Sequence, residues 1–251
     1  MMRFEDRSFR MQCASVAKRG AIVLAVATAV FAFAAASGFF TASVLLSLAH
    51  CIVAFFLFEA AYRAADAVPR GARRERLVFF VMFMGGSFAV FTSLYSIVLA
   101  PAALQTGIAV AGVLEPSVEA RLLVSLIVKA PNIIAWLMLW ALIGPALAMF
   151  AAGFEKPIAR WIMRDYGARL AALLSLSLPL RLLAAAAAGR GGAAAEPLLA
   201  GAPLEAPPVA LLLSLFAGAA IAAALLVEAV AAHRAFWAAH DPDEDTVRAF
   251  E

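Results

Sequence analysis

Six long apolar stretches dominate this chain, and each has the length of a membrane-spanning helix, which needs roughly 20 mostly apolar residues. Hydrophobic residues make up 65% of the 251 positions and charged residues only 15%. A water-soluble domain has about 45–50% apolar and about 25% charged residues, so it could not bury this much apolar surface. The sequence therefore predicts an all-α fold: a polytopic membrane helix bundle with six transmembrane helices.

Glycine, proline and charged residues separate the expected spans. The first apolar run, 21–62, is too long for one helix, and Ser37-Gly38-Phe39 offers a turn that divides it into two. Gly144-Pro145 is expected to mark a break after the fourth span. The segment 189–208, rich in Ala, Gly and Pro, is interpreted as a flexible outer loop, with a short re-entrant helix as the alternative. The remaining four spans are expected over 77–104, 122–142, 168–188 and 209–232.

Basic residues crowd alternate connections between the spans. By the positive-inside rule, both termini are therefore expected to be cytoplasmic. We divide the chain into a basic cytoplasmic segment 1–20, a six-helix transmembrane domain 21–233 and an acidic cytoplasmic tail 234–251. The N-terminus is also similar to a secretory signal, whose cleavage near Ala34-Ala35-Ala36-Ser37 would remove the first span without changing the orientation of the rest. The basic residues are Arg3, Arg7, Arg10, Lys18 and Arg19 before span one, Arg63, Arg70, Arg73, Arg74 and Arg76 after span two, and Lys156, Arg160, Arg164 and Arg169 after span four.

Motifs for enzymes, cofactors and nucleic acid are missing from the sequence. There is no P-loop, no dinucleotide-binding fingerprint and no HExxH zinc motif. The spans also lack paired aspartates, which an intramembrane protease would need. The net charge of +3 comes from residues beside the membrane, where anionic headgroups attract them. The chain is thus expected to be no enzyme, to carry no cofactor, to bind no nucleic acid, and to draw any energy from an ion gradient or a partner.

Two basic residues, Lys129 and Arg181, lie inside expected spans, where an ionisable group costs roughly 2.5–3.5 kcal/mol on insertion scales. Each lies eight positions from an expected outer boundary, which places it about 12 Å deep at 1.5 Å per residue. Pro131 and Pro179 lie two positions from them. A proline in a helix frees a carbonyl and bends the axis, and such helices tend to line cavities.

Ser125 and Asn132 share the helical face of Lys129, so these groups and Arg181, with His50 on span two, predict an outward-facing electropositive, solute-binding cavity between spans two, four and five. Such a cavity could hold an anion, a lipid headgroup or a partner's carboxylate. One alternative is that both long side chains reach the outer interface along their own length. Another is that a glutamate of the outer connections folds down to pair with them.

Three further ionisable residues call for an explanation. His50 in span two could ligate a metal or haem or relay protons. Since no second histidine lies within a span, an interhelical hydrogen bond is the preferred interpretation and no metal site is expected. Glu59 is expected to pair with Arg63, four positions later. Glu228, placed near the cytoplasmic end of span six, either couples proton movement to transport or forms a salt bridge with a nearby arginine.

Gly85, Ala89 and Ser93 lie on one side of span three, together with other small residues. Small side chains let a neighbouring helix approach closely. This face is therefore the expected central packing seam of the bundle.

Two functions fit these features. The first is a permease or permease subunit that moves an anionic or amphipathic solute through the cavity, with Glu228 and Glu59 as coupling groups. The second is a non-catalytic membrane subunit or assembly protein of a larger complex. In both cases the expected partners are the lipid bilayer and protein subunits docking on the connections 64–76 and 154–169, in a bacterial cytoplasmic membrane.

Overall fold

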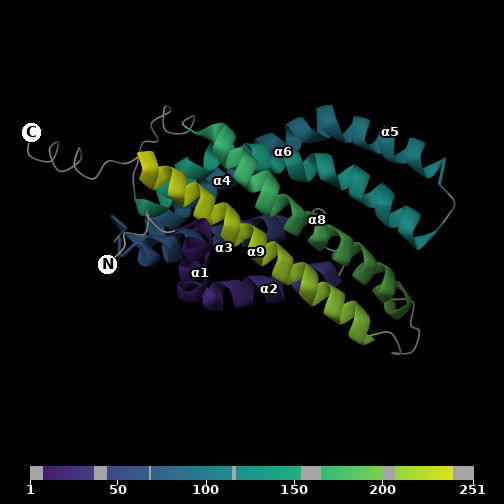
Figure 1. Ribbon diagram of the computed structural model, residues 1–251, viewed down its shortest axis with the longest axis horizontal. Coiled ribbons are helices and arrows are strands. Elements are labelled where there is room, and N and C mark those ends of the chain that lie inside the picture. Colours follow the sequence, from purple (N-terminus) through teal and green to yellow (C-terminus); the bar gives the residue numbers. More distant parts are fainter. Residues whose placement is uncertain are drawn as a thin grey trace, which may run out of the picture.

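The computed structural model describes residues 8–36, 44–67, 69–114, 117–153, 165–199 and 207–239, and every regular element in these ranges is a helix (Figure 1). The elements are α1 (Phe9–Arg19), α2 (Ala21–Ala36), α3 (Val44–Ala64), α4 (Arg73–Leu94), a π-helix (Tyr95–Leu99), α5 (Ala100–Ala111), α6 (Val118–Ala152), α8 (Tyr166–Leu199) and α9 (Pro207–Ala239). Five helices are long and apolar enough to cross a membrane, and six spans result if the bent pair α1–α2 counts as one. The prediction of an all-α fold with several helices long and apolar enough to cross a membrane is confirmed.

α1 and α2 meet at Gly20, where the chain bends by 83°. A Cβ added at Gly20 would lie 3.3 Å from the Cβ of Ala60, so the bend packs directly on α3. Val16 of α1 is fully buried against Ala60 and Ala61. α1 therefore lies across the end of α3 instead of continuing in the direction of α2.

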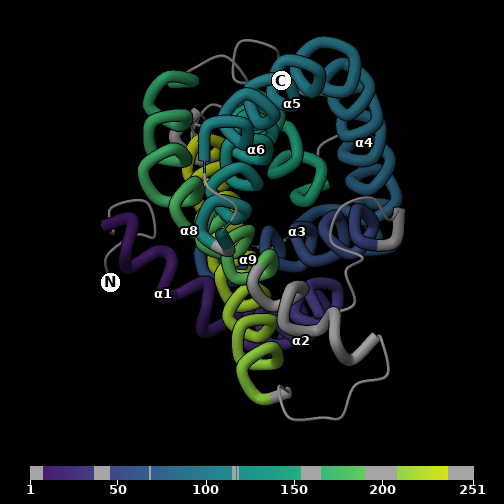
Figure 2. The backbone as a smooth tube through the Cα atoms, turned by 90° about the vertical axis from the view of Figure 1, so that its right-hand side faces the viewer, coloured from purple at the N-terminus to yellow at the C-terminus, as the bar shows by residue number. Residues whose placement is uncertain are grey.

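α9 is the centre of the bundle and packs along both α8 and α2 (Figures 1 and 2). A Cβ added at Gly218 of α9 would lie 2.3 Å from the carbonyl oxygen of Thr28 and 2.7 Å from the main-chain nitrogen of Ala32. The backbones of α9 and α2 therefore almost touch, which small residues permit in membrane helices. The tightest approach of α6 to α9 is of the same kind, since a Cβ at Gly144 would lie 2.9 Å from the Cβ of Ala232.

The small-residue face of α4 is not a packing seam within this chain, so that prediction is wrong. A Cβ added at Gly85 would meet no atom within 4 Å, and Ala89 and Ser93 are exposed. The Ser93 hydroxyl donates to the carbonyl of Ala89 on its own helix (2.9 Å). The spacing of small residues shows that a close neighbour is possible, but it does not show which helix has one, and here the seam lies on α9.

α6 and α8 are longer than the sequence predicts, because neither Gly144-Pro145 nor Gly189 ends a helix. Pro145 cannot donate to the carbonyl four residues earlier, which belongs to Ala141, and Arg169 Nε donates to that carbonyl instead (3.0 Å). α8 continues to Leu199, so the flexible loop predicted from residue 189 is wrong as far as 199. Residues 200–206 and the predicted turn at 37–39 lie outside the described residues.

α4 and α5 form one long helical segment, Arg73–Ala111, interrupted by a single π-helical turn. Pro101 lies just after this turn, at the start of α5, and lacks the N–H that would continue a regular ladder. α6 runs back along α5, and a Cβ at Gly107 of α5 would lie 2.6 Å from Val128 Cγ2 of α6. Only 11% of the most apolar window of this long segment is buried, and α4 and α5 lie at the periphery of the bundle (Figure 2).

One end of the bundle, which we call the basic end, is where α3, α6 and α9 finish and α4 and α8 begin. The main-chain N–H of Arg70 donates to the carbonyl of Ala152 at the end of α6 (2.8 Å). The ring of Tyr62 in α3 packs edge-on against His233 of α9, with centroids 4.7 Å apart. Helix ends from distant parts of the sequence therefore meet here. The basic residues near these ends are Lys18, Arg19, Arg63, Arg70, Arg73, Arg74, Arg76, Arg169 and Arg234.

Candidate functional site

A buried ion pair joins α8 to α9. Arg181 Nε lies 2.7 Å from Glu228 Oε1 and Arg181 Nη2 lies 2.8 Å from Glu228 Oε2, so the guanidinium grips both carboxylate oxygens. The Ser177 hydroxyl donates to the same Oε1 at 2.5 Å. The side chain of Arg181 is 10% exposed and that of Glu228 is 0% exposed. This two-pronged arrangement is the strongest form of an arginine–carboxylate contact.

Helical spacing explains how these groups converge. Ser177 and Arg181 are four residues apart on α8, so both project from one face of that helix. Trp140 Nε1 donates to the main-chain carbonyl of Glu228 (3.1 Å), which anchors α6 against the same point of α9. Sequence reasoning missed Ser177 and Trp140 as partners, although the position of Ser177 one turn before Arg181 was a usable signal.

The separation predicted for the two charges is wrong. The sequence placed Arg181 in the outer half of its span and Glu228 near the opposite end, yet their side chains are in contact, so the two groups lie at one level of the bundle. The apolar span within α8 ends at Gly189, as the sequence predicts.

His50 lies on α3, and its ring packs against Phe31 of α2 with centroids 4.6 Å apart. Cys51, the next residue, is buried. α3 therefore packs its histidine ring against α2, and the interhelical hydrogen bond of His50 stays a prediction.

Lys129 lies on α6 near the level of Arg181 on α8, as two contacts show. Leu122 approaches the Cβ position of Gly189 to 3.8 Å, and Arg169 reaches the carbonyl of Ala141, so the two helices run antiparallel with Lys129 opposite Arg181. Lys129 is half-buried, and in the described part of the chain no hydrogen bond or ion pair involves it. The two cations thus differ, since Arg181 is neutralised by Glu228 and Lys129 is not.

The two polar neighbours of Lys129 on α6 are less enclosed than the ion pair. Ser125 is half-buried and Asn132 is exposed. Each stays a predicted solute contact.

A second charged cluster lies at the basic end around Glu59 of α3. Its carboxylate accepts from Arg73 Nε at 3.0 and 3.1 Å and from Arg76 Nη2 at 3.1 Å, both on α4. Arg76 also donates to the carbonyl of Ala151. Among the described residues, Arg63 donates only to the main-chain carbonyl of Glu59 (3.3 Å). The predicted Glu59–Arg63 side-chain pair is therefore wrong, because two arginines of the next helix fold back onto the carboxylate.

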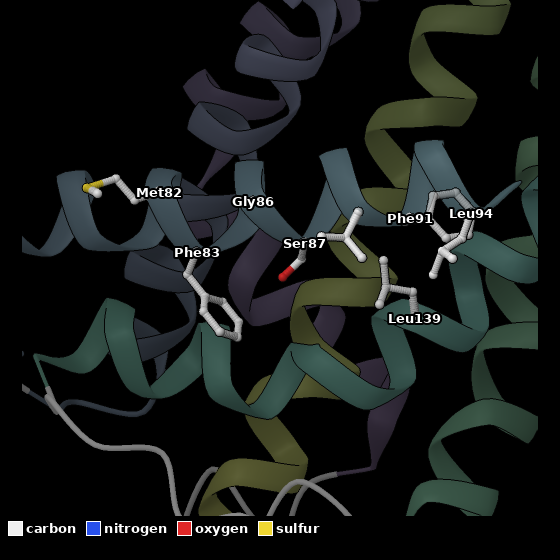
Figure 3. A pocket seen from close by; sticks show the side chains of 8 residues that line it. Met82, Phe83, Gly86, Ser87, Phe91, Leu94 and Leu139 are labelled. Atoms are coloured by element: carbon white, nitrogen blue, oxygen red, sulfur yellow. The ribbon is translucent and has the colours of Figure 1, made fainter. Parts of the chain in front are cut away.

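An apolar groove of about 470 Å³ lies between α4 and α6 (Figure 3). Phe83 and Ser87 point from α4 toward α6 along its wall. This groove is not the predicted cavity between α3, α6 and α8, and none of the predicted solute-binding residues lines it. Its lining consists of Met82, Phe83, Gly86, Ser87, Val90, Phe91, Leu94 and Leu139.

In the ranges that the structure describes, no three His, Cys, Asp or Glu side chains lie close enough together to bind a metal ion. No family model matches the chain, and neither the curated proteins nor the solved structures contain a match to it.

Proposed function

We propose that this chain is a permease, or the membrane subunit of one, that moves an anionic or amphipathic solute, with Arg181 as its anion-binding group and Glu228 as its coupling group. The observation that carries the proposal is the ion pair buried between α8 and α9. Ionisable groups at membrane depth are costly and commonly mark solute or ion pathways.

Stability alone gives little reason to keep this pair. Taking two charges out of water costs several kcal/mol per ion, and apolar residues of similar volume often serve the fold as well or better. A guanidinium offers a planar fork of donors that matches the oxygens of a carboxylate or phosphate. An anionic solute can therefore replace Glu228 on Arg181 without any change in the geometry of the donor.

Protonation supplies the step that frees Arg181. In the resting state the negative Glu228 occupies the guanidinium. When Glu228 takes up a proton it becomes neutral, its hold on Arg181 weakens, and an incoming anion can bind. Loss of the proton restores the pair and expels the anion. Because the anion binds the state in which Glu228 is protonated, the two equilibria are linked and the solute moves together with a proton.

Other groups fit this scheme as secondary elements. Lys129 on α6 lies near the level of Arg181, and Ser125 and Asn132 lie about one turn to either side of it on the same helix. We assign His50 of α3 to exchange the proton of Glu228. The cluster around Glu59 joins α3, α4 and α6, so a shift of one of these helices would change its hydrogen bonds.

The basic end supports an orientation with both termini in the cytoplasm, because the positive-inside rule places such residues there. We extend the proposal to a bacterial cytoplasmic membrane, to protein subunits docking on the connections 64–76 and 154–169, and to a chain that is no enzyme and binds no nucleic acid. Residues 154–164 lie outside the described residues, so docking rests there on the basic sequence alone.

A non-catalytic subunit or scaffold is the second candidate, and the uncovered α4–α5 segment favours it. Its most apolar window is 11% buried, and the small-residue face of α4 is open to a neighbour. A partner helix could pack closely there. In that case α4 would be the contact, and the Arg181–Glu228 pair would only hold the bundle together.

Proton flux in vesicles separates the two candidates. The purified chain would be reconstituted into liposomes containing a pH-sensitive dye, and a panel of small carboxylates and phosphates added outside. A permease of the proposed kind acidifies the interior with at least one anion. Glu228→Gln, which copies the protonated form, should keep anion binding and lose the proton flux.

Arg234→Gln, an exposed arginine of α9, is the matched control and should transport as the wild type does. All variants must elute as single species before they are compared. A wild-type flux that survives Glu228→Gln unchanged would contradict the coupling role. The absence of flux with every anion, joined with loss of a co-purifying protein in Ser93→Leu, would favour the scaffold.

A further inference from the structure

A second hollow of about 340 Å³ lies on α4, nearer to the basic end than the groove. Among the residues that line the two hollows, one set follows i, i+4, i+7, i+11 and i+15 spacing, so these residues project from one face of α4 as a stripe. The stripe begins with a charged residue and is apolar thereafter. It comprises Glu75, Phe79, Met82, Gly86 and Val90, with Arg74 beside its first member.

We propose that this stripe binds one membrane phospholipid whose headgroup carries both a phosphate and an ammonium group. The phosphate contacts Arg74, the ammonium contacts Glu75, and one acyl chain lies in the groove over Gly86. The proposal does not depend on solute transport, since it concerns a different face of the bundle from the Arg181–Glu228 pair.

The two charged side chains at the start of the stripe, Arg74 and Glu75, are free to bind a lipid headgroup. Arg73 and Arg76 are committed to Glu59, whereas Arg74 and Glu75 are exposed and, in the ranges described, take part in no hydrogen bond or ion pair. A guanidinium binds phosphate oxygens through paired donors. The carboxylate next to it would repel a headgroup that is only anionic, and it complements one that also carries an ammonium.

The dimensions of the groove suit one acyl chain. From Met82 to Leu94 there are 12 residues, or about 18 Å of helix, and half of a hydrocarbon core is about 15 Å thick. Gly86 leaves the floor open, because a Cβ there would meet no atom within 4 Å. Apart from the Ser87 hydroxyl the lining is apolar (Figure 3).

Native mass spectrometry of the full chain in detergent tests the site. Phosphatidylethanolamine and phosphatidylglycerol with identical acyl chains would be added separately at matched concentrations. We expect one bound phosphatidylethanolamine per chain, held at least about tenfold more tightly than phosphatidylglycerol, which corresponds to 1.4 kcal/mol.

Three variants and two matched controls locate the lipid. Gly86→Leu fills the groove and should lower lipid binding about tenfold, whereas Gly85→Leu makes the same change one residue away, outside the groove, and should leave it unaltered. Arg74→Gln should weaken both lipids, and Glu75→Gln should abolish the preference between them. Arg234→Gln, which removes an exposed charge elsewhere, should change neither.

Equal lipid retention by the Gly86 and Gly85 variants would overturn the groove as the site. Equal binding of the two lipids by wild type, unaffected by Glu75→Gln, would overturn the headgroup assignment. A dimer mass that Gly86→Leu removes, with no one-to-one lipid adduct, would show that a second copy of the chain covers the stripe. Because Arg74→Gln and Glu75→Gln alter exposed residues, they keep the test valid even if Gly86→Leu fails to fold.

Discussion

Removing one partner of the Arg181–Glu228 pair should destabilise the bundle much more than removing both. Glu228→Leu leaves the Arg181 guanidinium, whose side chain is only 10% exposed, without the carboxylate that accepts its two hydrogen bonds. An unpaired buried charge of this kind costs about 3–5 kcal/mol. The double variant Arg181→Met/Glu228→Leu replaces the pair by apolar groups and is expected to lie close to the wild type or slightly above it in stability.

The coupling between the two sites is the quantity to measure. A double-mutant cycle isolates it as the difference between the double variant and the two single variants. Hydrogen bonds between membrane helices average only about 0.6 kcal/mol and reach about 1.7 kcal/mol in such cycles. A coupling above about 2 kcal/mol therefore identifies a buried ion pair and not an ordinary polar contact.

Equilibrium unfolding in mixed micelles, followed by circular dichroism, gives the free energies. Ser214→Ala serves as the control on α9, because its buried hydroxyl has no hydrogen-bond partner among the described residues. That substitution should be neutral or stabilising. A coupling below about 1 kcal/mol, or a double variant as unstable as Glu228→Leu alone, would refute the reasoning. Either result would mean that Glu228 contributes little to stabilising the buried charge of Arg181.

Other predictions concern the backbone. Gly218→Leu should abolish the folded bundle in size-exclusion chromatography, because its Cβ would lie 2.3 Å from a main-chain oxygen of α2, whereas Gly85→Leu meets open space and should elute normally. Arg169→Met should lower the unfolding free energy by about 1–3 kcal/mol through an unpaired carbonyl, and adding Pro145→Ala, which restores an N–H, should recover most of it. Gly153→Ala should cost more than about 1–2 kcal/mol in the same assay, because φ is +89° and the new Cβ would lie 2.1 Å from a carbonyl oxygen.

The spans could be predicted from the sequence because bilayer thickness sets the length of an apolar helix. Their ends could not, since the rules for glycine and proline describe helices surrounded by water. Inside this bundle Gly144 allows α6 to approach α9, and the carbonyl freed by Pro145 finds a donor in Arg169. Neither Gly144 nor Pro145 therefore ends the helix.

The charged partners show a similar division. Glu59 and Arg63 satisfy the spacing rule for neighbours on one helix, yet the carboxylate prefers two arginines of α4 that a short connection folds back onto it. The sequence marks Arg181 and Glu228 as unusual charges within apolar spans, but their contact depends on the register of α8 against α9, and that register follows from side-chain packing along the whole interface. Spacing within one helix carries no information about it.

The π-helical turn at Tyr95–Leu99 has a consequence for how this chain can vary in length. A π-turn holds one residue more than an α-helical turn, and elsewhere in α4 or α6 a single deletion would rotate all following side chains by about 100°. At this turn the surplus residue can be lost while α4 keeps its face toward α6 and Gly107 stays against Val128. Of the positions described in the long segment, this turn is therefore where insertions and deletions of one residue should accumulate among related chains.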